Sequence, residues 1–153
     1  MSNITFNIAK GRVVELYNRV KSNDPTNAAL ILVPIETSGL EADATLIDAD
    51  TLAALLSGTT NEQTTMGRKT LTDAELAALP APDDTNDRYD ISLPTTTWVA
   101  ATGNAISKIA VGYDPDTTGG TDANIIPLTM FDFTQTPSGA DIQMTGGPFF
   151  RAS

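Results

Sequence analysis

Apolar and polar residues alternate in short runs along much of the chain, which is the period of half-buried β-strands. Residues 4–8 and 88–93 show this alternation, whereas residues 28–35 are apolar on both faces, as in a buried strand. Further strands are predicted over residues 95–101, 105–113, 125–135 and 141–145. The first two of these are expected to form a hairpin through residues 102–104.

Two segments carry helix signals. Residues 50–58 combine a capping residue, helix-forming residues and a terminal glycine, which predicts one short helix. Thr72 and Glu75 have capping-box spacing, and Pro80 ends the turn that begins there. Residues 12–20 fit a helical face as well as a strand, so both remain open. The predicted fold class is mainly β, a β-sandwich or jelly-roll-like domain with one or two short helices.

The chain has 153 residues, of which 41% are hydrophobic and 18% charged, and this supports one folded domain over residues 1–153. We find no internal repeat and no linker that would divide it. The start of the chain lacks the basic and apolar regions of a signal peptide. The longest apolar run, residues 28–35, is far shorter than the roughly 20 residues that cross a bilayer. We therefore expect a soluble chain that is made and kept in the cytoplasm, with no membrane partner.

The formal net charge of −10 would repel a phosphate backbone, so a nucleic-acid partner is not expected. The absence of Cys and His excludes disulfides, cysteine nucleophiles and imidazole-based catalysis. No cofactor is implied by any motif. A non-enzymatic protein is the favoured interpretation.

One loop has the residue types of a cation site. Asp114, Asp116 and Asp122, with the turn glycines between them, match the first half of a calcium-binding EF-hand loop. The second half fails, because Ile125 stands where a bidentate Glu is needed. These three aspartates are therefore weak metal candidates, and an acidic connection whose carboxylates cap turns is the favoured alternative.

Two further groups invite a functional interpretation. The acidic turn Asp83, Asp84, Asp87 and Asp90 could supply a carboxylate pair for hydrolysis, but general acid catalysis needs a shielded carboxyl with a raised pKa. We expect these carboxylates to stay in water. The aromatic residues of the predicted strands are expected to lie in the core rather than to stack on a ligand; they are Trp98, Phe131 and Phe133.

The two ends of the chain are the candidate contact surfaces. Phe149 and Phe150 are adjacent, so they cannot both point inward from one extended strand. One of them is therefore a candidate for coverage by a partner, and the alternative is a tail folded back on its own core. Segments 1–10 and 146–153 are proposed as partner-contacting arms, with the contact residues Ile4, Phe6, Phe149, Phe150 and Arg151.

A set of ordered runs adds a resemblance that covers nearly the whole chain. The runs are AKGRV (9–13), SGLEADATL (38–46), DTLA (50–53), TNEQ (60–63), DDTNDR (83–88), YDPDT (113–117), DANIIPLT (122–129) and FRAS (150–153). Together they resemble a family of head decoration, or cement, proteins of tailed bacteriophages. The resemblance rests on order and spacing and includes no catalytic signature.

The resemblance implies a virion protein on the outer capsid surface, bound at capsomer junctions and stabilising the head against DNA pressure. The implied partners are the major capsid protein and further copies of the chain, as a homodimer or homotrimer. A tail or head–tail completion protein is the first alternative. The second is a calcium-dependent module that binds carbohydrate or a host surface through the loop at 114–122.

Overall fold

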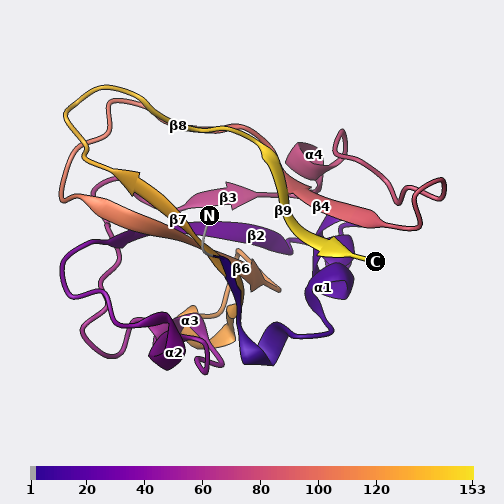
Figure 1. Ribbon diagram of the computed structural model, residues 1–153, viewed down its shortest axis with the longest axis horizontal. Coiled ribbons are helices and arrows are strands. Elements are labelled where there is room, and N and C mark those ends of the chain that lie inside the picture. Colours follow the sequence, from indigo (N-terminus) through magenta and orange to yellow (C-terminus); the bar gives the residue numbers. More distant parts are fainter. Residues whose placement is uncertain (1–2) are drawn as a thin grey trace.

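A five-stranded antiparallel sheet forms the centre of the computed structural model, which describes residues 3–153 (Figure 1). The strands follow the order β1-β7-β6-β2-β3. Their bounds are β1 (Asn3–Thr5), β7 (Ile126–Gln135), β6 (Ile106–Asp114), β2 (Ala29–Glu36) and β3 (Lys69–Leu71). The long strands β2, β6 and β7 supply most of the buried sheet.

A bent two-stranded ribbon lies over one face of this sheet (Figure 1). Its outer half pairs β4 (Tyr89–Leu93) with β9 (Gly147–Ala152), and its other half pairs β5 (Thr96–Trp98) with β8 (Ile142–Met144). Two short bends, at residues 94–95 and 145–146, join the halves. The protein is mainly β, with 35% strand and 18% helix, and the predicted β-sandwich class is confirmed.

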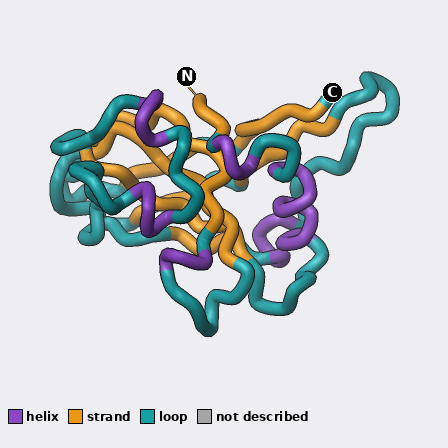
Figure 2. The backbone as a smooth tube through the Cα atoms, turned by 90° about the horizontal axis from the view of Figure 1, so that it is seen from below, coloured by secondary structure: helices purple, strands orange, loops and turns teal. Residues whose placement is uncertain are grey.

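Short helices cover both sides of the sheet, and Figure 2 shows them around the strands that fill the middle of the molecule. On the ribbon side lie α1 (Val13–Lys21) and α4 (Asp73–Leu76). On the opposite face lie α2 (Asp43–Leu46) and α3 (Leu52–Leu55). Two 3-10 turns, η1 (Asn7–Ala9) and η2 (Asp122–Asn124), complete the helical content of the described residues, which exceeds the predicted one or two helices.

Residues 12–20, for which the pattern fitted a helix as well as a strand, form most of helix α1. Its buried residues Val13, Leu16, Tyr17 and Val20 recur at helical spacing and pack under the ribbon. The helix at 50–58 is confirmed as α3, capped by Thr51, whose Oγ1 accepts the amide of Ala54 at 3.0 Å. The capping box of α4 is present as predicted.

The sheet separates two apolar cores, which explains why β2 is apolar on both faces. Leu30 and Leu32 join the core under the ribbon and α1. Ala29, Ile31, Val33 and Ile35 join the second core, under α2 and α3. Strand β2 is therefore a buried central strand, as its composition predicted.

The predicted hairpin of 95–101 with 105–113 is wrong. Strand β5 pairs with β8, whereas β6 pairs with β2 on one side and β7 on the other. Strand β6 is buried over most of its length, so its main-chain N–H and C=O groups need hydrogen-bond partners on both edges. The three-residue strand β5 is too short to pair with the whole of β6.

The predicted N-terminal strand over residues 4–8 is also shorter than expected. Strand β1 ends at Thr5, and η1 begins after Phe6. Strand β3 and helix α2 had no prediction. Within residues 3–153 no helix is long and apolar enough to cross a membrane.

Candidate functional site

The acidic loop at 114–122 does not gather its carboxylates. Asp122 binds the guanidinium of Arg68 through two hydrogen bonds, of 2.6 Å from Nη1 and 2.8 Å from Nη2. Arg68 also binds Glu62 at 2.8 and 2.7 Å. The Arg68 hydrogen bond lowers the pKa of Asp122, so this carboxylate remains a charged ion-pair partner.

The other two aspartates of the loop stabilise turns. Asp114 accepts the amide of Asp116 at 3.0 Å, and Asp116 accepts the amide of Thr118 at 3.0 Å and its hydroxyl at 2.6 Å. These are the local hydrogen bonds that aspartate favours in turns. Among residues 3–153, no group of three or more Asp or Glu side chains is arranged to hold a metal ion.

Residues 83–87 of the acidic turn lie in a loop that extends away from the body of the molecule between α4 and β4 (Figure 1), whereas Asp90 is part of β4. Asp83 accepts the amides of Thr85 and Asn86, at 3.1 and 3.2 Å, and Asp90 forms ion pairs with Arg151 and Arg88. Hydrogen bonds lower the pKa of both carboxyl groups, from Asn86 for Asp83 and from Arg151 for Asp90. Neither group has the raised pKa of a general acid.

The aromatic residues of the strands lie largely in the core, as predicted. Trp98 and Phe131 are buried, and the indole Nε1 of Trp98 donates to the carbonyl oxygen of Gly67 at 2.9 Å. Phe133 is half-buried, with its ring 6.3 Å from that of Trp98. Phe133 also lines a surface cleft, which is described below.

The proposed contact residues at the two chain ends divide into buried and accessible ones. Phe6 is 0% exposed in the second core, so its proposed contact with a partner is corrected, while Ile4 is half-buried. Phe149 is 9% exposed and packs 6.3 Å from the ring of Tyr17, so its side chain also belongs to the core. Phe150 is half-buried, and Arg151 is exposed but paired with Asp90.

A β-bulge explains why Phe149 is buried whereas Phe150 is only half-buried. In the β4–β9 pairing, Ile91 faces Phe150 and Ser92 faces Pro148, so Phe149 is the extra residue. The proposed arm at 146–153 is thus a strand of its own chain, and the folded-back alternative is the observed one for Phe149. Residues 3–5 of the other arm form β1, and residues 1–2 lie outside the described part.

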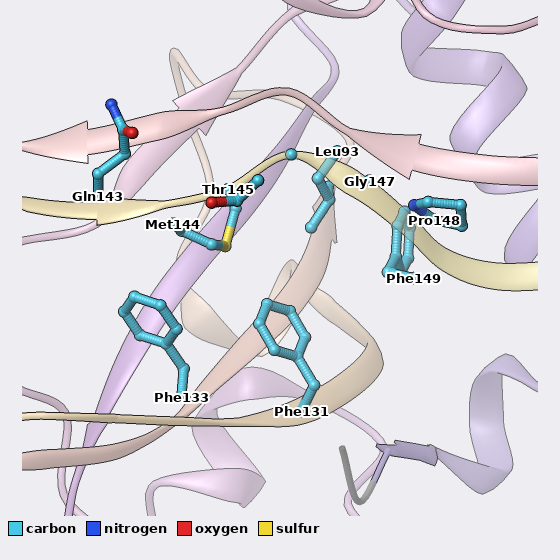
Figure 3. Close-up of a pocket in the computed structure, with 10 residues that line it drawn as sticks. Leu93, Phe131, Phe133, Gln143, Met144, Thr145, Gly147, Pro148 and Phe149 are labelled. Atoms are coloured by element: carbon cyan, nitrogen blue, oxygen red, sulfur yellow. The ribbon is translucent and has the colours of Figure 1, made fainter.

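Two depressions flank the bend of the ribbon, and no sequence motif indicated either. The first, the ribbon cleft, has a volume of about 330 Å³ and lies between the bend and β7 (Figure 3). The residues that line it are Leu93, Phe131, Phe133, Gln143, Met144, Thr145, Gly146, Gly147, Pro148 and Phe149. None of them is charged, so the cleft can accept an apolar group and offers no charged acid or base.

The second depression, the proline groove, has a volume of about 480 Å³ and lies beside the segment that follows α4. Its lining residues are Leu79, Pro80, Ala81, Asp83, Asp90, Ser92, Leu93, Pro94, Thr95, Gly146, Gly147 and Pro148. The two carboxylates in this set are already held by arginines or turn amides. Both depressions share Leu93, Gly146, Gly147 and Pro148, because only the bend separates them.

The distribution of charge is a signal that could have indicated this region. Residues 91–107 contain no charged side chain, and residues 133–150 contain one, Asp141, although 18% of the whole chain is charged. These two segments form β5, β8, both bends and much of the cleft wall. The structure therefore concentrates uncharged surface at one region of an acidic protein.

Comparison with known proteins yields no relative: no family model, curated protein or solved structure matches the chain.

Proposed function

We propose that this chain is a non-enzymatic decoration, or cement, protein of a tailed-phage head, bound to the outer capsid surface at capsomer junctions. The family resemblance of the sequence suggests this role. The structural observation that carries the proposal is the proline groove beside β9: a wide depression with apolar walls whose carboxylates are engaged in ion pairs and turn hydrogen bonds. Such a surface suits docking of another protein better than chemistry.

In the proposed mode of binding, β9 and the groove face the major capsid protein. Pro148 is exposed, and Phe150 is half-buried beside it, so an apolar side chain of the capsid can lie along this strand. Main-chain pairing with the outer edge of β9 is disfavoured, because Pro148 lacks an amide proton and the bulge at Phe149 interrupts the edge. The contact is therefore formed mainly by side chains.

In this proposal, the binding of many copies over the shell stabilises the head against the pressure of packaged DNA. One interface of ordinary size, about 1,600 Å² in total, gives useful affinity, and many copies over the shell multiply the restraint. Each copy would clamp a seam that packaged DNA otherwise pushes apart. The net charge of −10 favours solubility and mutual repulsion of particles, which is compatible with an outer position.

The first test is the copy number of the chain in purified virions, measured by quantitative mass spectrometry relative to the major capsid protein. A copy number comparable with that of the capsid protein supports decoration. A copy number small enough for a single ring would instead place the chain at the neck or tail, as a completion protein. Absence from the particle would overturn the virion proposal.

The second test addresses the groove. Ala81→Asp adds a charge to the groove wall at an exposed position, and Ala53→Asp adds the same charge at an exposed position of α3, on the other side of the sheet. In cosedimentation with capsids stripped of the chain, Ala81→Asp should reduce binding at least tenfold, while Ala53→Asp binds like the unmodified chain. Equal binding of the two variants would exclude the groove as the capsid contact.

A further inference from the structure

The central sheet buries one lysine between two carboxylates. Among residues 4–153, whose burial is described, Lys108 on β6 is the one charged residue that is buried, at 8% exposed. Its Nζ lies 2.6 Å from Asp132 Oδ1 and 3.2 Å from Asp43 Oδ1. The attraction within a buried ion pair is largely offset by the cost of desolvating its charges. Stability is therefore a weak explanation of this cluster.

The choice of lysine is a second distinguishing feature. The other ion pairs found within residues 3–153 all use arginine, namely Arg19, Arg68, Arg88 and Arg151. A guanidinium stays charged and fits carboxylates with two hydrogen bonds, whereas a buried lysine can lose its proton and act as a nucleophile. Lys108 is thus the cation type that can react with a neighbouring carboxyl group.

Strand pairing holds the two groups that would react. Lys108 and Asp132 lie directly opposite one another in the β6–β7 pair. A C–O bond is about 1.2 Å long, which places the carboxyl carbon of Asp132 within about 3.8 Å of Lys108 Nζ. Reacting atoms in a near-attack arrangement are roughly 3–3.5 Å apart. A small rotation of either side chain is enough to reach this separation.

The surroundings shield the amine and leave the carboxylate at the solvent boundary. Ala110 and Met130, the next pair on the same face of β6 and β7, are buried in the second core. Helix α2, which covers this face, carries Asp43 in its first turn (Figure 1). The side chain of Lys108 is 10% exposed and that of Asp132 is 44% exposed. A small molecule released at Asp132 can therefore leave to solvent.

We propose that Lys108 and Asp132 condense into an isopeptide (amide) bond between β6 and β7, with Asp43 as the catalytic proton carrier. The Lys108 ammonium first gives a proton to Asp132, which leaves a neutral amine beside a neutral carboxylic acid. The electron pair of the amine then attacks the carboxyl carbon of Asp132 and forms the C–N bond.

Asp43 completes the reaction from the other side of Nζ. It takes the second proton from the nitrogen and passes it to the departing hydroxyl group of Asp132, so that the C–O bond breaks and one water molecule leaves. The ammonium and the carboxylate thus become an amide and water. Asp43 ends as it began, and no oxidant, reductant or further reactant is consumed.

The starting charge state sets the pace of the reaction. Burial lowers the pKa of Lys108, but hydrogen bonds with Asp132 and Asp43 raise it, and the net change is a rise. The lysine therefore starts as an ammonium, and the bond should form faster as the pH increases.

The bond would supply a covalent link to a chain that has no cysteine. It joins residues 24 positions apart and would keep β6 and β7 connected even after unfolding.

The test is the intact mass of the purified chain, measured before and after incubation at about pH 9 until the mass is constant. We expect a mass lower than that of the sequence by one water molecule. Lys108→Arg keeps the cation and Asp132→Ala removes the carboxyl group, and both should keep their full mass. Asp43→Asn should slow the reaction at least tenfold. Asp50→Asn, at an exposed position near α3, should react like the unmodified chain.

Tandem mass spectrometry of a digest locates the lost water. The expected product is a peptide containing Lys108 joined to one containing Asp132. An unmodified chain that keeps its full mass after incubation, or a water lost at any other residue, would overturn the proposal. So would an equal loss in Lys108→Arg, once circular dichroism has shown that this variant is folded. The bond lies within one chain, so this result is independent of the capsid-binding tests.

Discussion

The hydroxyl of Tyr17 donates a hydrogen bond of 3.0 Å to the main-chain carbonyl oxygen of Ser92, joining α1 to the ribbon next to its bulge. Tyr17 is 0% exposed, and its ring lies 6.3 Å from those of both Tyr89 and Phe149. This contact fixes the position of the ribbon over the helix. It therefore supports both depressions that flank the bend.

Removal of this hydroxyl should destabilise the protein without removing the ring. We expect Tyr17→Phe to lower the free energy of unfolding by about 1–2 kcal/mol, because the Ser92 carbonyl loses its partner in a buried place. Urea denaturation followed by fluorescence measures the difference. An unchanged midpoint would mean that water satisfies the carbonyl as well as Tyr17 does.

The same variant should change the response to alkali. Burial, with a further contribution from Tyr89, raises the pKa of Tyr17 to about 12 from an ordinary value of about 10. A folded-state pKa above the unfolded one gives stability that is complete below pH 10 and is lost as the pH rises towards 12. Tyr17→Phe should show a shallower loss of stability over this interval, measured by urea denaturation at each pH.

Asp122 should produce the opposite pH dependence. The hydrogen bonds from Arg68 lower the pKa of Asp122 in the folded state. This ion pair therefore contributes its full stability above the ordinary aspartate pKa of roughly 4, and the contribution is lost as the pH falls from there through the lowered folded-state pKa. Asp122→Asn should cost about 1 kcal/mol at neutral pH, a value reduced by solvent screening of this partly exposed pair. The deficit should shrink in acid. Asp84→Asn, at an exposed position, is the control and should behave like the unmodified chain.

Calcium should have no stabilising effect. Asp122 is occupied by Arg68, and Asp114 and Asp116 accept turn amides, so binding would require these contacts to break. Thermal unfolding with millimolar calcium and with a chelator should give the same Tm. A Tm that rises with calcium concentration would show binding to the folded state and would revive the calcium-dependent alternative.

Gln63 should control the order of the loop over residues 99–105, which follows β5. Gln63→Leu leaves the carbonyls of Thr102 and Asn104 and the amides of Thr65 and Met66 without this partner, and we expect a loss of about 2–3 kcal/mol. Hydrogen exchange at the amides of Ala101 and Gly139 should accelerate beyond what global destabilisation explains. Gln135→Leu, at an exposed site, should leave these amides protected.

Two glycines provide a matched comparison at this loop. Gly103 and Gly139 both have positive φ, +106° and +89°, so a Cβ atom strains both. At Gly103 a Cβ would also lie 2.1 Å from Gln63 Nε2, whereas at Gly139 it would meet nothing within 4 Å. Gly103→Ala should therefore lower the Tm more than Gly139→Ala. Equal effects would show that backbone strain alone decides.

Local patterns were sufficient to predict the elements whose signals lie within a few residues. The capping box of Thr72 and Glu75, the short helix after Thr51 and the long buried strand at Ala29–Glu36 are all present. Trp98 and Phe131 are in the core, as strand alternation predicted. The carboxylates of the loop at 114–122 stabilise turns, as the short-range chemistry of aspartate favours.

The partners in the sheet and the two depressions required the tertiary structure, for a physical reason. Alternation specifies which side of a strand is apolar, but it carries no information about which distant strand will cover it. The choice of β8 rather than β6 as the partner of β5, the pairing of Arg68 with Asp122 and the inward turn of Phe149 all depend on residues far apart in the chain. The sequence thus determined a β-rich, acidic domain with segments free of charge, and only tertiary packing decided that these segments form the walls of a cleft.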